Sequence, residues 1–284
     1  MKKYFSLIKF SHTIFALPFA LIGFFLSAPQ KKIDWTIFIY VVLCMIFARS
    51  AAMAFNRYID RDIDGANKRT SKNREIPNGT ISANSALTFV IINCIFFIIT
   101  SYLINKTCFY LSPVALTIIL GYSYTKRITA LCHLFLGLGL SLAPLGAYLA
   151  VNEAFDVLPI LFSATVLFWV SGFDIIYSLQ DHEFDKKYKL YSIPVKIGKK
   201  NALNFSKLFH VISVIILIFT GLTFHFKEFY WIGFSIFATL LIYQHRLVSE
   251  DNLKNLNLAF FTTNGIGSLI FGFFVILDLL INIT

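Results

Sequence analysis

The stretch NRYIDRDIDGANKR, residues 56–69, follows directly on a long apolar run and holds three aspartates among four basic residues. On an α-helix, with about 100° between successive residues, Asn56, Asp60 and Asp64 fall within an arc of about 80°, while Asp62 points away. Like charges four residues apart destabilise a helix by roughly 0.2–0.5 kcal/mol. A stripe of this kind therefore predicts a bound cation.

A second acidic stretch, DIIYSLQDHEFD at residues 174–185, repeats the pattern later in the chain. Four of its residues share one helical face: Asp174, Tyr177, Asp181 and Asp185. Asp60 and Asp181 lie 121 residues apart. Because acids next to a membrane are costly, two such stripes point to one shared cation site.

The composition is that of a membrane protein. Of the 284 residues, 57% are hydrophobic and 14% are charged, whereas soluble domains carry roughly 25% charged residues. The net charge of +10 does not indicate nucleic acid as a partner, because no hydrophilic segment is long enough to present a basic face. We expect residues 1–284 to form a single membrane domain whose partner is the lipid bilayer.

Apolar runs of about 20 residues predict transmembrane helices. Nine are expected, so the fold class is an all-α integral membrane protein with one bundle of helices. The expected spans are 11–28, 35–55, 86–105, 108–125, 131–151, 158–178, 208–225, 229–245 and 258–281.

The distribution of lysine and arginine predicts the orientation of the bundle. The N-terminus and the loops on its side of the membrane carry 20 basic residues, and the opposite side carries 4. Because cytoplasmic loops hold the excess of bases, the N-terminus is expected in the cytoplasm and the C-terminus outside, in a bacterial inner membrane. The acidic stretches then fall four spans apart on the cytoplasmic side. This spacing predicts two repeated four-helix units plus a ninth helix, around a central cavity that opens to the cytoplasm.

Magnesium is the cation that fits these stripes best. It takes one or two protein carboxylates and fills its other positions with water and phosphate oxygens, and basic residues flank both stretches. Most of these lysines are expected only to follow the distribution of charge across the membrane. Arg69 and Arg74 instead indicate phosphate binding.

Three segments of the chain resemble the signatures of the UbiA superfamily of membrane prenyltransferases. The first is Asn56-x3-Asp60-x3-Asp64 followed by KRTSKNREIPNGTIS, and the second is Asp181-x3-Asp185 with the residues around it. The third is GYSYTKRIT at residues 121–129. The residues of these three motifs are most similar to those of the 4-hydroxybenzoate polyprenyltransferase branch. One departure is a glutamate at position 75, where members of the family commonly have proline.

The resemblance implies a magnesium-dependent transfer of a polyprenyl group from a polyprenyl diphosphate donor to an aromatic acid acceptor in quinone biosynthesis. The acceptor is expected to be 4-hydroxybenzoate, prenylated beside its hydroxyl, and a dihydroxynaphthoate acceptor in menaquinone biosynthesis remains an alternative. The metal would be held by Asn56, Asp60, Asp64, Asp181 and Asp185. The departing diphosphate would be neutralised by Arg69, Arg74, Lys126 and Arg127. Tyr177 is expected to be catalytic, and Asp174 to bind substrate.

Arg49 lies inside the second expected span, on the helical face of Asn56 and Asp60. A buried arginine normally faces a cavity or a partner, and its planar fork suits a carboxylate. We therefore expect Arg49 to bind the carboxylate of the acceptor. A structural ion pair with an acid, for example Asp174, is the alternative.

Other residues are expected to have structural roles. His12 and His133, at the starts of two spans, are expected at the membrane interface, and Gly137, Gly139 and Gly146 are expected to permit close helix packing. A cation-coupled transporter would also use acids within the membrane, at midplane sites beside broken helices. The position of these acids at cytoplasmic helix ends favours the enzyme.

Overall fold

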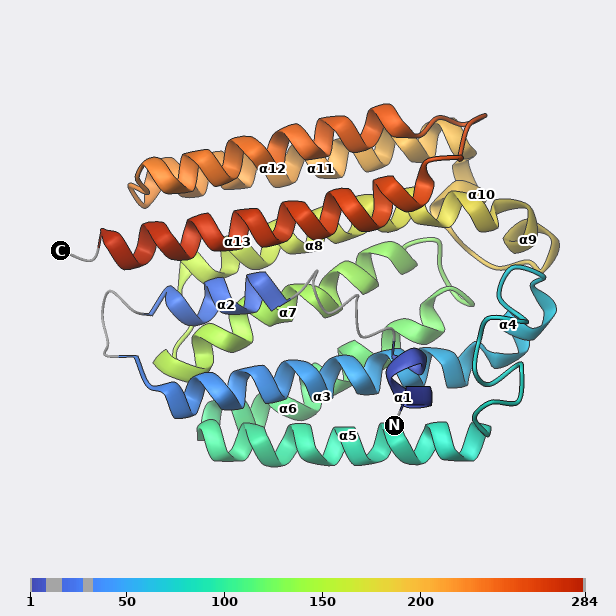
Figure 1. The fold of residues 1–284 in the computed structure, drawn as a ribbon, viewed down its shortest axis with the longest axis horizontal. Coiled ribbons are helices and arrows are strands. Elements are labelled where there is room, and N and C mark those ends of the chain that lie inside the picture. The colour runs from blue at the N-terminus through green and yellow to red at the C-terminus, as the bar shows by residue number, and fades with distance from the viewer. Residues whose placement is uncertain (1, 9–16, 28–32, 283–284) are drawn as a thin grey trace.

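The computed structural model of the chain describes residues 2–8, 17–27 and 33–282, and within these ranges it contains helices and no strand (Figure 1). The helices are α1 (Lys2–Leu7), α2 (Leu17–Phe25), α3 (Trp35–Ile59), α4 (Arg61–Ala66), α5 (Ala83–Ile104), α6 (Lys106–Thr125), α7 (Cys132–Asn152), α8 (Val157–Ser178), η2 (Leu179–Asp181), α9 (His182–Lys187), α10 (Ile193–Ile197), α11 (Lys199–Thr223), α12 (Glu228–Leu247), η3 (Leu258–Thr262) and α13 (Thr263–Ile281). The expected all-α class is confirmed.

Seven helical segments in the described part of the chain are long and apolar enough to cross a membrane. They contain α3, α5, α6, α7, α8, α11 and α13. The chain is therefore an integral membrane protein. Helix α12 is not among the seven, and neither is α2, whose expected span at 11–28 lies partly outside the described residues, as does His12. The count of nine spans stays a prediction.

Most helix ends fall within a few residues of the expected spans, with one exception. Helix α11 begins at Lys199, nine residues before the expected start at 208. The first turns of α11 are rich in polar residues such as Lys200 and Asn201, and hydropathy alone predicts a loop there. A helix can extend beyond the bilayer, where polar side chains are solvated, so hydropathy marks the membrane segment rather than the helix end.

The two acidic stretches do not lie on continuous helices, which corrects the sequence-based expectation. Helix α3 ends at Ile59, Asp60 forms the junction, and α4 begins at Arg61. The backbone still repeats helical spacing, because Asp60 N–H donates to Asn56 O at 2.9 Å and Asp64 N–H to Asp60 O at 2.7 Å. Likewise α8 continues into a short 3₁₀ turn, η2, before α9. The turns keep the acids on one side while they end the long helices.

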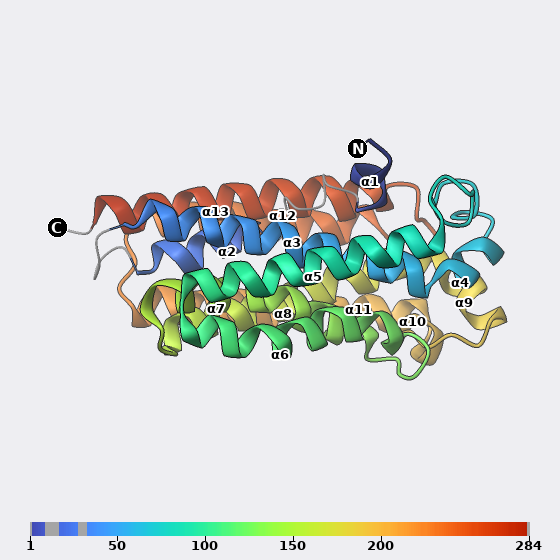
Figure 2. The same cartoon turned by 90° about the horizontal axis from the view of Figure 1, so that it is seen from below.

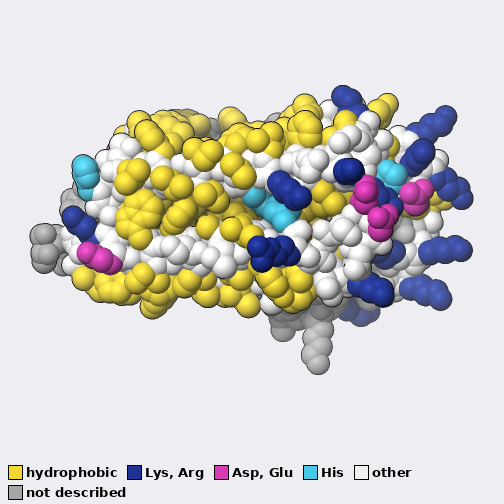
Figure 3. All heavy atoms as spheres, turned by 90° about the horizontal axis from the view of Figure 1, so that it is seen from above, with side chains coloured by type: hydrophobic (Ala, Val, Ile, Leu, Met, Phe, Trp, Pro, Cys, Tyr) yellow, Lys and Arg dark blue, Asp and Glu magenta, His cyan; other side chains and the backbone are white. Residues whose placement is uncertain are grey.

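Both acidic junctions lie at the same end of the bundle. Helices α4 and α9 are neighbours at the right of Figures 1 and 2, whereas α13 ends at the opposite side. Figure 3 shows lysine and arginine side chains gathered at this end, around acidic side chains, with a mainly apolar surface between the two ends. This distribution matches a bundle whose middle faces lipid.

The largest buried cluster packs α2, α8, α11, α12 and α13 around Trp169. Its indole Nε1 donates to Asn264 Oδ1 at 3.0 Å, so the buried polar atom is satisfied. Gly137 permits close packing as expected, because a Cβ there would overlap the backbone oxygen of Leu167. Gly139 and Gly146 do not pack closely and instead line a cavity, where their small size leaves space.

Candidate active site

A polar cavity of about 260 Å³ lies where the acidic junctions meet the bundle. Nine of the twelve predicted site residues line it: Arg49, Asn56, Asp60, Arg69, Arg74, Lys126, Asp174, Tyr177 and Asp181. The other three, Asp64, Asp185 and Arg127, each form an ion pair with a lining residue. The structure thus brings the predicted residues into one site, although they come from four separate parts of the sequence.

Each of the four motif aspartates is paired with one of the four bases predicted to bind diphosphate. The pairs are Asp60–Arg127 at 3.3 Å, Asp64–Arg74 at 3.1 Å, Asp181–Arg69 at 2.6 Å and Asp185–Lys126 at 2.8 Å. The acids and bases therefore balance one another in this structure. A ligand that carries both a cation and phosphate groups could replace all four pairs by exchange of partners.

The two motif loops contact each other directly through Asp181. Arg69 binds it with two parallel hydrogen bonds, from Nε to Oδ1 at 3.0 Å and from Nη2 to Oδ2 at 2.6 Å. Asn67 Nδ2 also donates to Asp181 Oδ1 at 3.0 Å. Residues more than a hundred positions apart in sequence thus form one rim of the cavity.

Burial changes the electrostatics of the first acidic junction. It raises the pKa of Asp64 to about 6, against the opposite effect of the nearby Arg57. Burial also raises the pKa of Asp60, although Arg127 and Lys126 act to lower it. Carboxyl groups in such surroundings hold a proton more readily than usual, and a bound cation would favour their ionised form.

The donor set suits magnesium in type. Within the described ranges, no three acidic, histidine or cysteine groups are already arranged to hold a metal ion. Asp185 Oδ2 is nevertheless buried with no hydrogen-bond partner in the described chain, and Oδ1 has Lys126 Nζ beside it. Magnesium prefers oxygen ligands, so an unpaired carboxylate oxygen is a suitable ligand for it.

Tyr177 lies in a stack of aromatic and cationic groups. Its ring lies 4.1 Å from that of Phe260, at an interplanar angle of 29°, and the guanidinium of Arg69 lies 6.0 Å from the ring centroid. Phe260 is placed there by η3, a single π-helical stretch at the start of the last helix. Such π-turns often occur at functional sites. The Tyr177 ring therefore already stabilises positive charge in this structure.

In the described chain, Asp174 is bonded to His133 and not to Arg49. Asp174 Oδ2 is bonded to His133 Nδ1 at 2.7 Å, and no ion pair joins it to Arg49 in the described chain. Arg49 Nε is buried without a hydrogen-bond partner there. His133, which is expected at the membrane interface, is buried within the bundle, where the residue is only 2% exposed and its side chain faces Asp174.

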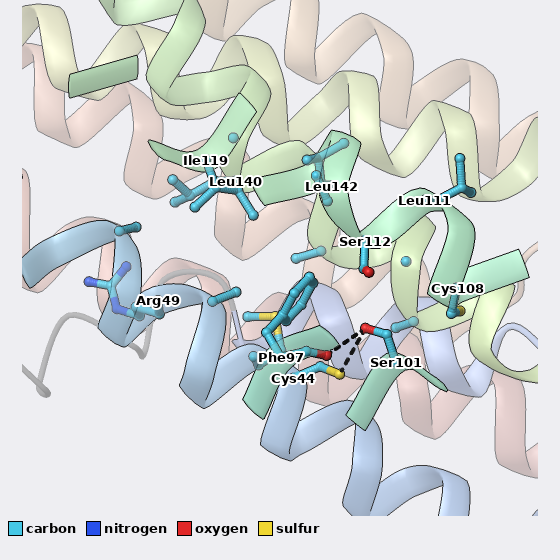
Figure 4. Close-up of a pocket in the computed structure, with 18 of the residues that line it drawn as sticks. Cys44, Arg49, Phe97, Ser101, Cys108, Leu111, Ser112, Ile119, Leu140 and Leu142 are labelled. Atoms are coloured by element: carbon cyan, nitrogen blue, oxygen red, sulfur yellow. Dashed lines mark hydrogen bonds between the residues drawn. The ribbon is translucent and has the colours of Figure 1, made fainter. Parts of the chain in front are cut away.

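An apolar cavity of about 190 Å³ adjoins the polar one, between α3, α5, α6 and α7. Figure 4 shows Arg49 at one side of it and Cys108 toward the other, with Leu140 and Leu142 on the facing wall. Five residues line both cavities: Arg49, Met53, Tyr122, Leu136 and Leu140. A ligand with a charged head and an apolar tail could therefore occupy the two together.

Some lining residues were missed by the sequence analysis. Tyr122 lies within the quoted stretch 121–129 but had no assigned role, and Phe260 lies in an apolar run that carries no functional signal. Arg57, one of the four basic residues in the stretch 56–69, had no assigned role, yet it is buried and lines the polar cavity. A buried base one residue after Asn56 could have been recognised from the helical phase of the motif.

A membrane bundle with paired acidic junctions and a joined polar and apolar cavity suits a ligand with a charged head and an apolar tail. The chain belongs to the UbiA prenyltransferase family, whose model matches residues 16–266. It is a membrane prenyltransferase. Membership of this family identifies the chain as an enzyme rather than a cation-coupled transporter.

Relatives and solved structures agree with this family. The chain is 31% identical over 241 residues to a 4-hydroxybenzoate octaprenyltransferase of Aliivibrio fischeri (strain MJ11), covering 84% of this chain and 82% of the relative. It resembles the apo structure of a UbiA homologue from Aeropyrum pernix K1 with a TM-score of 0.85, 31% identity and coverage of 94% and 98%. A UbiA homologue from Archaeoglobus fulgidus, solved with DMAPP and Mg²⁺, shares the fold with a TM-score of 0.74, 22% identity and coverage of 98% and 99%.

Proposed function

We propose that this enzyme transfers a polyprenyl group from a polyprenyl diphosphate to 4-hydroxybenzoate, at the ring carbon beside the hydroxyl, in quinone biosynthesis. The observation that carries the proposal is the set of four acid–base pairs around one cavity. The relatives named 4-hydroxybenzoate octaprenyltransferase support the choice of acceptor.

The charge of the site suits a diphosphate with a metal ion. The cavity and its ion-paired neighbours contain six bases and five aspartates, which leaves one net positive charge. A prenyl diphosphate carries about three negative charges, roughly one more than a phosphate monoester. The site with donor alone would therefore be negative, and a divalent cation would neutralise it.

We assign the metal to Asn56, Asp60, Asp64, Asp181 and Asp185. Magnesium at this position would supply neutralisation of the charge that develops on the leaving diphosphate. Asn56 now donates from Nδ2 to Asp60 Oδ2 at 3.0 Å, which holds both side chains at the junction. The homologue solved with Mg²⁺ supports this choice of ion.

The four bases act on the diphosphate once it has replaced their carboxylate partners. Arg69 and Arg74 come from the first motif loop, and Lys126 and Arg127 from the end of α6. Preorganised cations of this kind stabilise negative charge as the carbon–oxygen bond breaks. Tyr177 and its stacked partner Phe260 supply ring faces to the allylic cation that forms.

The prenyl tail is assigned to the apolar cavity. Its lining is aliphatic and aromatic apart from a few hydroxyl and thiol groups and Arg49. A tail placed there would start beside Tyr122 and Met53, which border both cavities. Burial of each CH₂ group contributes about 0.8 kcal/mol, so this cavity would supply much of the donor affinity.

The acceptor is assigned to the space between Arg49 and Asp174. Arg49 offers a buried guanidinium without an ion pair in the described chain, and Asp174 offers a carboxylate in the same polar cavity. A 4-hydroxybenzoate molecule has a carboxylate at one end and a hydroxyl at the other. The two side chains would fix both ends of the ring.

Metal removal tests the proposed reaction. In detergent-purified enzyme with a prenyl diphosphate and 4-hydroxybenzoate, we expect EDTA to abolish formation of the prenylated acid and excess magnesium to restore it. Product is measured by mass spectrometry, together with the diphosphate released. Calcium is the control ion, because it carries the same charge as magnesium but prefers a different coordination geometry. Full turnover in EDTA would contradict the assignment of the aspartates to a metal.

The same assay compares acceptors. We expect faster turnover of 4-hydroxybenzoate than of 1,4-dihydroxy-2-naphthoate, because Arg49 and Asp174, which both line the cavity, would bind the carboxylate and the para hydroxyl of 4-hydroxybenzoate. Preferred turnover of the naphthoate would instead assign the enzyme to menaquinone biosynthesis. Hydrolysis of the donor without transfer to any aromatic acid would refute the proposed acceptor class.

We further propose that residues 1–284 form a single domain in a bacterial inner membrane. The acidic junctions and the cavity mouth face the cytoplasm, and the C-terminus lies outside. The repeated units and the nine spans remain part of this proposal. The distribution of basic residues supports the orientation.

Cysteine labelling of spheroplasts tests the orientation. In a variant without the four native cysteines, we expect Thr80→Cys and Lys187→Cys to react only after the membrane is permeabilised, because both are exposed on the motif loops. Ala154→Cys, exposed at the opposite end of α7, is expected to react in intact cells. Reaction of Thr80→Cys and Lys187→Cys from different sides would contradict the parallel repeat.

A further inference from the structure

His133 is a buried residue beside the polar cavity, and it has no role in the proposed reaction as described above. It is the second residue of α7, and its side chain is almost fully enclosed. Its Nδ1 lies 2.7 Å from Asp174 Oδ2. This is the only hydrogen bond of the Asp174 side chain in the described chain, and Asp174 lines the cavity with its side chain 22% exposed.

The second ring nitrogen determines the proton position. The backbone N–H of Ile193, the first residue of α10, points at His133 Nε2 from 3.4 Å. A backbone N–H can only donate, so Nε2 is the acceptor and Nδ1 carries the proton. His133 therefore donates from Nδ1 to Asp174 Oδ2.

The surrounding backbone fixes this ring in place. Ser171 Oγ donates to the backbone oxygen of His133 at 3.1 Å. The segment that supplies the Ile193 N–H is itself attached to the α6–α7 loop, because Tyr191 N–H donates to Lys126 O at 2.8 Å. One docked segment therefore supports both His133 and Lys126.

We propose that His133 is the positioning residue for the acceptor. It orients Asp174 through Oδ2 and leaves Oδ1 turned to the cavity, where Oδ1 accepts the hydrogen bond of the acceptor's ring hydroxyl. This inference rests on the proposed function, and it adds the group that distinguishes a phenolic acceptor from an aromatic acid without a hydroxyl. His133 itself touches neither substrate nor metal and takes part in no covalent step.

Three substitutions separate this role from simple packing. An asparagine amide nitrogen lies close to the position of a histidine Nδ1, and a glutamine amide nitrogen close to that of Nε2. His133→Asn therefore keeps a donor toward Asp174, His133→Gln displaces it, and His133→Leu removes it. His225→Asn, exposed at the far end of the bundle, is the matched control.

We expect His133→Leu to raise the acceptor KM at least about tenfold, as loss of one hydrogen bond to a charged group does. The affinity for a non-hydrolysable prenyl diphosphate analogue with magnesium should stay within about twofold of wild type. His133→Asn should recover most of the acceptor KM and His133→Gln less. Equal acceptor KM values for the Asn, Gln and Leu variants would overturn the proposal, as would a parallel loss of donor affinity.

A spectroscopic measurement covers the case in which His133→Leu does not fold. In enzyme labelled with ¹⁵N-histidine, the His133 signals are assigned by their loss in His133→Asn. We expect them to report a protonated Nδ1 and an unprotonated Nε2 at neutral pH. The opposite tautomer would overturn the proposal. If wild type prenylates no aromatic acid, the proposed function fails by itself, whereas normal wild-type turnover with an unaffected Leu variant removes only the role of His133.

Discussion

Asp60→Asn and Asp181→Asn should each lower kcat at least about a hundredfold at saturating donor. Each substitution removes one of the charges that would hold magnesium at the diphosphate, and metal stabilisation of transition-state charge contributes several kcal/mol, while each factor of ten in rate corresponds to about 1.4 kcal/mol. The two residues lie on different loops of one cavity. A similar loss from both would show that the two motifs act on the same leaving group.

Asp62→Asn is the matched control for this experiment. It makes the same chemical change in the same short helix, but the Asp62 side chain is 79% exposed and points away from the cavity. We expect its kcat to stay within about twofold of wild type. Near-normal turnover of Asp60→Asn or Asp181→Asn, in protein that elutes as wild type does, would falsify the metal assignment.

The removal of one aspartate also frees its basic partner, and this gives the variants a second measurable property. Asp181→Asn leaves Arg69 without the two hydrogen bonds that now hold it. The freed guanidinium can still bind diphosphate, so donor affinity should fall much less than kcat. A loss confined to donor affinity would instead indicate that Asp181 only positions Arg69.

Helical periodicity predicted which acids share one face, because the spacing of side chains changes little where a short turn interrupts the helix. Asp60 and Asp181 were expected to share one cavity, and both line it. The helix end at Ile59 was not expected, since a hydrogen-bonded turn keeps nearly the same spacing on either side of the break. The spacing of the acids therefore predicted their common face correctly and the continuity of the helix wrongly.

Periodicity along one helix could not predict side-chain contacts between segments that are distant in the sequence. His133 begins an apolar run, and only the packing of α7 against α8 reveals that it faces Asp174. Phe260 belongs to a mainly apolar stretch, and it lies on the π-helical turn, where its ring stacks on Tyr177. Neither residue type is unusual in a membrane helix, so no local signal separates them from their neighbours.

Arg49→Leu should raise the acceptor KM for 4-hydroxybenzoate between about 10- and 100-fold, because a hydrogen bond to a charged group contributes roughly 1.5–3 kcal/mol. The buried Nε of Arg49 lacks a partner in the described chain, and Asp174 is already engaged by His133. A planar guanidinium can bind a carboxylate with two parallel hydrogen bonds. Donor affinity should change little, since the four bases assigned to the diphosphate, which are paired with the motif aspartates, are unchanged.

The specificity of the Arg49 variant decides between a ligand-binding and a structural role. Wild type should prefer 4-hydroxybenzoate strongly over an uncharged phenol of the same size, and Arg49→Leu should lose most of that preference. Arg61→Leu, on a partly exposed base that stacks on Tyr58, should keep it. If the folded Arg49 variant also keeps the preference, the carboxylate is held elsewhere. Lys126 and Arg127 are then the next cations to replace, because both already face the acidic side of the cavity.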